Sequence, residues 1–129
     1  AAPQAPPPNP TVAPQAPPAC PSSKAKLVFT IQTDDYGAQT HFKILMKNKA
    51  GEFKKKVLNA KKFKSNKLVT REKCINEKKC YKFIIKDRGN DGICCAHGNG
   101  WYTLTKDGYI LKESVFKNKK KENKMFGNC

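Results

Sequence analysis

The segment 87–92 carries side chains whose types suit a hard metal ion. Carboxylate and amide oxygens on a tight turn are the ligands that Ca²⁺ prefers, and further carboxylates from another loop could complete the shell. By type, the candidate calcium ligands are Asp87, Asn90, Asp91, Asp34 and Asp35. The spacing is not that of an EF-hand, because with Asp87 in first place Gly89 and Gly98 fall where a carboxylate and a bidentate Glu are needed. The alternative, which we favour, is a turn in which Asp and Asn side chains cap backbone amides.

Two histidines and several lysines could supply the acid, the base and the phosphate clamp of a small basic ribonuclease. The spacing of His41 and His97 does not require this role. His41 begins an alternating segment, and His97 lies in a Gly-containing loop two residues after Cys95. The chain also has no Gly-x-Ser-x-Gly elbow, P-loop or HExxH motif. The sequence therefore predicts a protein that is not an enzyme.

Lysine dominates the charge of this chain. The 26 basic residues outnumber 10 acidic ones, and only Arg71 and Arg88 are arginines, so the net charge is +16. The candidate polyanion-binding lysines stand in two runs, namely Lys54, Lys55, Lys56, Lys61, Lys62, Lys64 and Lys67 in the first, and Lys117, Lys119, Lys120, Lys121 and Lys124 in the second. Such a surface attracts phosphate, sulfate or carboxylate polymers, and its affinity falls as salt rises.

Specific readout of nucleic-acid bases is not expected, because planar bidentate recognition draws on Arg rather than on the flexible point charge of Lys. The alternative interpretation is that the lysines are an ordinary solvated surface, which reflects solubility and a compositional bias of the coding sequence. Composition favours neither interpretation over the other.

Six cysteines stand at positions 20, 74, 80, 94, 95 and 129. The number is even and no CxxC pair is present, which favours a disulfide framework in an oxidising compartment over a zinc site or a redox motif. The framework is expected to involve Cys20, Cys74, Cys80, Cys94, Cys95 and Cys129. The adjacent Cys94 and Cys95 are expected to reach different partners, because a bond between neighbours strains the preferred disulfide geometry.

The chain divides near Ser23. All nine prolines lie between Pro3 and Pro21, and residues 1–23 have no charged side chain, which is typical of a disordered or semi-rigid polyproline spacer. A PxxP-type ligand segment is the alternative. Residues 24–129 form the expected folded domain, which needs covalent support at this size. There is no apolar run of about 20 residues, and the Ala-Ala start resembles the mature side of a signal cleavage site, so we expect a secreted, extracellular protein.

The domain is predicted to be all-β. Apolar residues alternate with polar ones in three segments, around Leu27, Phe29 and Ile31, around Phe42, Ile44 and Met46, and around Tyr81, Phe83 and Ile85. Asp107-Gly108 predicts a type I′ hairpin between segments 101–106 and 109–112. Shorter strands are expected at 68–70, 115–116 and 125–126, whereas 53–63 also fits a short helix. Seven or eight short strands predict a disulfide-stabilised antiparallel β-sandwich or jelly roll.

The segment 81–111, YKFIIKDRGNDGICCAHGNGWYTLTKDGYIL, resembles a β-sandwich module of secreted diatom, oomycete and bacterial proteins, often found beside subtilisin-like peptidases. The turn TDDYGAQT at 33–40 is similar to the turn that precedes the same pattern in that module. The Cys-Cys pair followed by spaced glycines also resembles the CCG class of effectors that plant-colonising oomycetes secrete. The resemblance implies a secreted β-sandwich domain.

Three functions are open at this point. The first is a secreted, non-catalytic, effector-like binding module of a host-colonising microbe, which acts on a host protein or an anionic surface polymer through its loops and lysine-rich faces. The second is a structural protein of an extracellular matrix, cell wall or mineral. The third is a small secreted basic nuclease or antimicrobial protein. No cofactor other than the candidate Ca²⁺ is expected.

Overall fold

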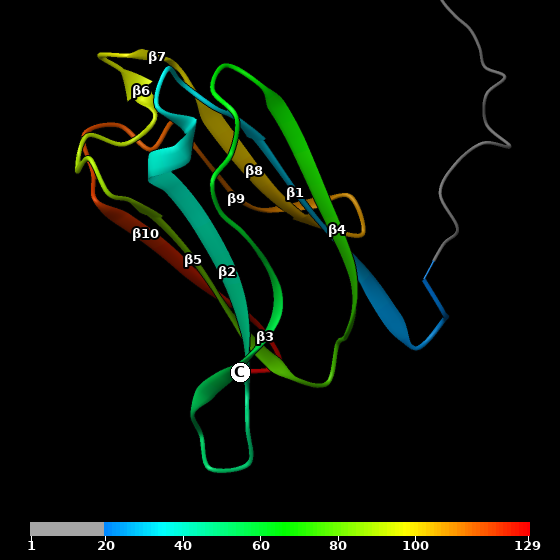
Figure 1. Ribbon diagram of the computed structural model, residues 1–129. Coiled ribbons are helices and arrows are strands. Elements are labelled where there is room, and N and C mark those ends of the chain that lie inside the picture. Colours follow the sequence, from blue (N-terminus) through cyan, green and yellow to red (C-terminus); the bar gives the residue numbers. More distant parts are fainter. Residues whose placement is uncertain (1–19) are drawn as a thin grey trace, which may run out of the picture.

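The computed structural model describes residues 20–129, which form two four-stranded antiparallel sheets packed face to face (Figure 1). Sheet A has the strand order β4 (Leu68–Asn76), β1 (Lys24–Gln32), β8 (Trp101–Lys106) and β9 (Tyr109–Ser114). Sheet B has the order β10 (Lys121–Gly127), β5 (Cys80–Asp87), β2 (Thr40–Lys47) and β3 (Phe53–Ala60). The predicted all-β sandwich is confirmed. The predicted Pro-rich spacer lies outside the described residues except for positions 20–23.

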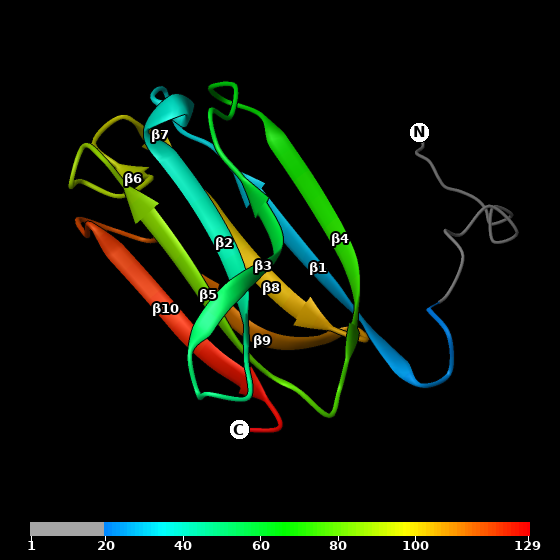
Figure 2. The same cartoon turned by 60° about the horizontal axis from the view of Figure 1, so that its bottom comes forward.

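Three short elements complete the chain at one end of the sandwich. These are the 3₁₀ turn η2 (Gly37–Gln39) and the strands β6 (Cys94–Cys95) and β7 (Gly98–Asn99), which pair with each other. Cys94 also forms an isolated β-bridge with Lys117. Figure 2 shows them, together with the β3–β4 connection, at the end opposite the C-terminus. We call this end the loop end. Among residues 20–129, no helix is long and apolar enough to cross a membrane.

Side-chain alternation explains why these segments form strands. In β1, Leu27, Phe29 and Ile31 are fully buried, while the residues between them are only partly covered. β2 and β5 follow the same pattern through residues such as Phe42 and Phe83. Each strand therefore gives one face to the space between the sheets and one to the outside.

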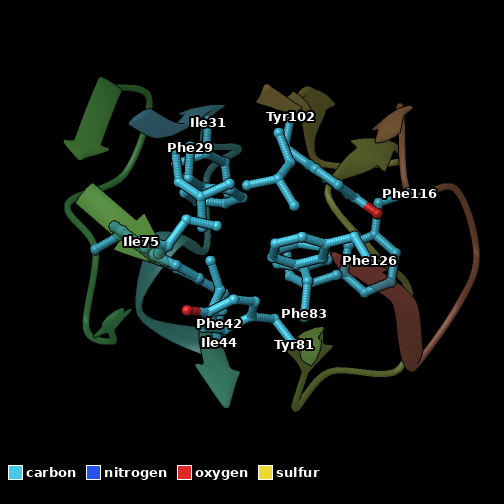
Figure 3. Packing of buried hydrophobic residues seen from close by; sticks show 14 of the residues in the cluster. Phe29, Ile31, Phe42, Ile44, Ile75, Tyr81, Phe83, Tyr102, Phe116 and Phe126 are labelled. Atoms are coloured by element: carbon cyan, nitrogen blue, oxygen red, sulfur yellow. The ribbon is translucent and has the colours of Figure 1, made fainter. Parts of the chain in front are cut away.

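Aromatic rings fill that space (Figure 3). Phe29 of sheet A stacks on Phe42 of sheet B with ring centroids 3.9 Å apart, and it also lies 5.6 Å from the ring of Phe83 and 5.9 Å from that of Tyr102. Aromatic pairs at such separations contribute energy beyond their buried area. Phe29 thus joins the two sheets at the centre of the core.

The predicted β8–β9 hairpin is confirmed. Asp107 and Gly108 have φ values of 49° and 85°, as a type I′ turn requires. The Asp107 carboxylate also accepts a hydrogen bond of 2.9 Å from the amide of Lys26, which ties the turn to β1.

Two other segments differ from their sequence-based interpretations. The predicted strand at 115–116 is wrong, because Phe116 has a φ of 49° and lies in the β9–β10 connection, where its buried ring packs edge-on against Tyr102. Its carbonyl accepts the amide of Ile93 at 3.0 Å instead of a ladder bond. Residues 53–60 form the edge strand β3 rather than the alternative short helix, with a bulge in its pairing to β2.

The disulfide framework is confirmed, but one expectation within it is wrong. Cys20 pairs with Cys74 and Cys80 pairs with Cys129, both at the end of the sandwich where β1 begins and β10 ends. Cys94 and Cys95 are bonded to each other rather than to different partners. The physical reason is their place in the fold, because they follow β5 at the loop end while the other four cysteines pair at the opposite end.

Candidate anion-binding site

The two predicted lysine runs lie along opposite edges of sheet B. β3 and the connection after it carry the first run, and the β9–β10 connection and β10 carry the second. The outer face of sheet B lies between them. Its register places His41 of β2 beside Lys86 of β5, and Lys86 beside Lys121 of β10. Directly paired residues point to the same side of a sheet, so basic groups continue across this face from one edge toward the other.

A cleft of about 380 Å³ opens on this face near the loop end. Its cationic lining consists of Lys43, Lys56, Lys61, Lys62 and Arg88, with His41 and Asn59 between them. No carboxylate lines the cleft, and none of the five cations forms a salt bridge within residues 20–129. We call these five cations with His41 the basic cleft.

Burial and neighbouring cations both disfavour the charged form of His41. Its burial, together with the positive charges of Lys86 and Lys43, lowers the pKa of the His41 imidazole below its usual value of 6.5. Arg88 and Lys61 act in the same direction. Since like charges disfavour a protonated imidazole, the cleft holds a surplus of positive charge that an anion would relieve.

Segment 61–67, which supplies two of the cleft lysines, is fixed by hydrogen bonds to the end of β1. The Thr33 hydroxyl donates to the Lys64 carbonyl at 2.7 Å and accepts from the Lys67 amide at 2.9 Å. The Asn66 amide donates to the Asp34 carbonyl at 2.9 Å. The 33–40 turn that the sequence singled out therefore holds the lysine-bearing loop in place.

Packing against buried residues also fixes the position of this loop. Phe63 is only 6% exposed, and its ring stacks parallel to that of Phe42 with centroids 6.4 Å apart. Gly37 lies so close to the loop that a Cβ on it would stand 2.6 Å from the Lys64 carbonyl oxygen. The backbone of the lysine loop is thus pre-organised by its contacts.

A second groove, of about 560 Å³, adjoins the basic cleft. It shares Lys61 and Lys62 with the cleft and adds Lys64, Lys67 and Arg71 along the loop and β4. β3 and β4 are the edge strands of the two sheets and lie next to each other. Positive side chains therefore extend from the outer face of sheet B around this side of the sandwich.

The structure separates the remaining predicted lysines from the cleft. Lys54 lies 3.4 Å from Glu52, and Lys119 lies 3.0 Å from Glu122, so both are paired with carboxylates. Lys55 lines a different hollow beside β4. Lys117, Lys120, Lys121 and Lys124 lie on the β10 side of sheet B.

The candidate calcium ligands form hydrogen bonds within the protein. Both amides that follow Asn90 donate to Oδ2 of Asp87 at 2.9 Å, which closes a capped turn around Asn90, whose φ is 62°. Asp34 accepts the Tyr36 amide at 2.9 Å, and Asp35 accepts the Asn66 side-chain amide at 3.1 Å. Within residues 20–129, no group of three or more His, Cys, Asp or Glu side chains is placed to hold a metal ion.

We therefore predict that the melting temperature is the same in EDTA and in millimolar Ca²⁺, because the carboxylate oxygens already accept amide hydrogens. Differential scanning calorimetry measures this directly. A ligand that binds only the folded state raises the melting temperature. An increase that depends on Ca²⁺ concentration and is lost in Asp87→Asn would establish the metal site instead.

The two histidines have different surroundings. His97 Nε2 lies 3.5 Å from a carboxylate oxygen of Asp91, and its ring packs edge-on against Tyr36 at 4.7 Å between centroids. The charged groups near His41 are all cations. The contacts of the two imidazoles therefore share no residue.

Sequence reasoning missed Lys43, Lys86 and Arg88 because all three lie outside the two lysine runs. The signal was present in the alternation, since Lys43 and Lys86 occupy the outward positions of β2 and β5. These residues can be recognised as parts of one site only when the strand order is known.

Comparisons of the chain with protein-family models, with curated proteins and with solved structures find no match. The resemblance to the secreted β-sandwich module accordingly stays a prediction from the sequence.

Proposed function

We propose that this protein is a secreted, non-catalytic binding module whose basic cleft binds an anionic surface polymer. The observation that carries the proposal is the cleft itself, in which five cations from β2, β3 and two connections converge without a single carboxylate in its lining. Unpaired like charges gathered in one concave place destabilise the free protein and are relieved by a bound anion. A surface that served solubility alone would be expected to intersperse carboxylates among its lysines, as at Lys54 and Lys119.

A polymer fits the site better than a small anion. The basic cleft continues into the second groove through Lys61 and Lys62, so a chain of sulfate or carboxylate groups would meet cations along its length. Lysine side chains accept many anion geometries, and Arg88 is the only residue in the cleft lining with a planar guanidinium group for bidentate recognition. The cleft is therefore expected to select a polymer by its charge density rather than by a specific sequence of units.

The disulfides and the sequence resemblance suggest where this binding takes place. Three disulfides in a domain of this size are typical of an oxidising, extracellular environment. We propose that the protein is an effector-like product of a host-colonising microbe and that the polymer belongs to the surface of the host. Recovery of one host protein from tissue extract after the removal of anionic glycans would favour the host-protein alternative instead.

Retention on immobilised heparin and on polygalacturonate tests the proposal. The logarithm of the binding constant should fall linearly with the logarithm of the salt concentration, because bound counterions are released. Elution well above physiological salt is expected. Elution at or below physiological salt would leave the lysines as an ordinary surface, and hydrolysis of RNA that is lost in both His41→Ala and His97→Ala would refute the non-catalytic assignment.

Binding to the polyanion should strengthen as the pH falls from 7 to 5. The pKa of His41 lies below 6.5 in the free protein, and a bound anion that offsets the neighbouring cations raises it. The complex then holds more protons than the free protein, so binding takes up a proton and is favoured at lower pH. Isothermal titration calorimetry at several pH values measures this uptake.

The variant His41→Asn is the control, since it keeps a polar side chain of similar size and removes the titrating group. It should bind with little dependence on pH over this range. The same pH dependence in the variant and in the wild type would show that His41 does not face the bound anion.

A further inference from the structure

The part of the outer face of sheet A that lies near the loop end differs in charge from the rest of this protein. Thr30 of β1 is paired with Thr70 of β4 and with Thr103 of β8, so three hydroxyls form a row across three strands. Neighbouring members of such a row lie about 4.8 Å apart. The next row joins Gln32 to Leu68 and to Trp101. In a chain with a net charge of +16, none of these six residues of β4, β1 and β8 is charged, and the first row ends on β9 at Glu113.

Trp101 lies at the loop end of this neutral face. It is the only tryptophan of the chain, and it is 38% exposed. A shallow groove of about 270 Å³ runs beside it and is lined by Thr103, Glu113, Ser114 and the half-exposed Val115. The groove thus offers an aromatic surface, hydroxyls and a carboxylate next to one another.

Glu113 is the one acidic side chain without a partner among the contacts formed within residues 20–129. The other nine acidic side chains accept a hydrogen bond or form a salt bridge there. Glu113 does neither, although lysines are abundant in the chain. Its register with Thr103 places it on the outer face, where its two oxygens remain free to accept hydrogen bonds.

We infer that the groove beside Trp101 binds a neutral, pyranose-based glycan. The faces of a sugar ring carry C–H groups that pack on an indole ring, and its rim carries hydroxyls. Glu113 accepts hydrogen bonds from those hydroxyls, and Thr103 and Gln32 can both donate and accept them. Tryptophan has a rigid, amphipathic side chain, and such residues dominate binding at small contact surfaces.

Charge distinguishes this ligand from the alternatives. A polyanion would find the cations of the basic cleft on the other sheet and would be repelled by Glu113. A polycation would be repelled at long range by the net charge of +16. The neutral rows therefore match an uncharged polymer, and the inference does not rest on the polyanion proposal.

The single tryptophan makes the test direct, because the fluorescence of the protein reports on Trp101 alone. We would titrate the protein with hexamers of β-1,4-linked N-acetylglucosamine and of β-1,4-linked glucose, in molar salt that suppresses polyanion binding. A saturable change in emission and protection of Trp101 from acrylamide quenching are expected with at least one hexamer. The inference would be overturned if neither hexamer gave either signal and if the protein was not retained on insoluble chitin or cellulose.

Variants assign the binding to the groove. Trp101→Ala should weaken retention on the insoluble glycan by about tenfold or more, as expected for the loss of a central aromatic anchor. Glu113→Gln should weaken it less, and Tyr109→Ala, which removes an aromatic ring that is 77% exposed at the far hairpin, should leave it unchanged. Equal loss in Tyr109→Ala, binding only to polycationic chitosan, or protection of Trp101 by self-association without glycan would each overturn the inference.

Substitutions at one of the two sites should leave binding at the other site unchanged. Reversal of charge in the basic cleft should leave glycan binding at its wild-type strength, and Trp101→Ala should leave heparin binding unchanged. Loss of both activities in either variant, with an unchanged melting temperature, would contradict a separate glycan site.

Discussion

The triple variant Lys43→Glu, Lys62→Glu and Arg88→Glu is expected to bind heparin about 100-fold more weakly than the wild type, a loss of about 2.7 kcal/mol. The three side chains come from β2, from the β3–β4 connection and from the turn after β5, and they face the same cleft. Each substitution removes an attraction and adds a repulsion, and like charges placed opposite one another are costly. The dependence of the binding constant on salt should become shallower by about one unit of slope for each lost contact.

A matched variant separates the cleft from net charge. Lys49→Glu, Lys78→Glu and Lys79→Glu alter three lysines that line a hollow between the β2–β3 and β4–β5 turns, at the end of the sandwich opposite the loop end. Each reversal removes two charges, so both triple variants carry +10 instead of +16. The matched variant should lose only a few-fold in affinity. Equal losses in the two variants would show that overall charge, and not the cleft, determines binding.

Phe29→Ala is expected to lower the free energy of unfolding by about 4 kcal/mol, since truncation of a buried phenylalanine removes its transfer energy and leaves a cavity. Phe29 is fully buried and lies against rings of both sheets, including Phe42, Phe83 and Tyr102. The site depends on this packing, because Phe42 also supports Phe63 beneath the lysine loop. Urea denaturation followed by circular dichroism gives the value.

The neighbouring Val28→Ala is the control, because Val28 points away from the core and is partly exposed. It should cost less than about 1 kcal/mol. Phe29→Leu should be intermediate, since it keeps most of the apolar volume. A loss below about 1 kcal/mol in Phe29→Ala would contradict a single core shared by the two sheets.

Local patterns predicted those parts of the fold that depend on neighbouring residues in the chain. Alternation located three of the four inner strands, and Asp107-Gly108 located the hairpin, because each depends on a few consecutive residues. Phe116 was misread because its burial comes from a loop that folds over Tyr102, and a two-residue apolar run looks the same in a strand or in such a loop.

The disulfide pattern and the site depend on contacts between distant segments. Whether Cys94 can reach another cysteine depends on which end of the sandwich each cysteine occupies. The spacing of the cysteines along the sequence does not give these positions. The same holds for the basic cleft, where the lysine runs supplied Lys56, Lys61 and Lys62 but the strand order supplied Lys43 and Arg88. Charge density in the sequence therefore predicted a basic surface, and the topology of sheet B determined where its cations gather.

Chemical-shift mapping with a heparin-derived oligosaccharide tests the central claim most directly. In two-dimensional spectra of the ¹⁵N-labelled protein, the largest changes should appear at His41, Lys43, Lys62 and Arg88, and smaller ones along the second groove at Lys64 and Lys67. Residues at the opposite end, such as Lys78 and Lys79, should stay unchanged. Changes spread evenly over lysines on all sides of the sandwich, or no saturable change at physiological salt, would contradict a binding site in the basic cleft.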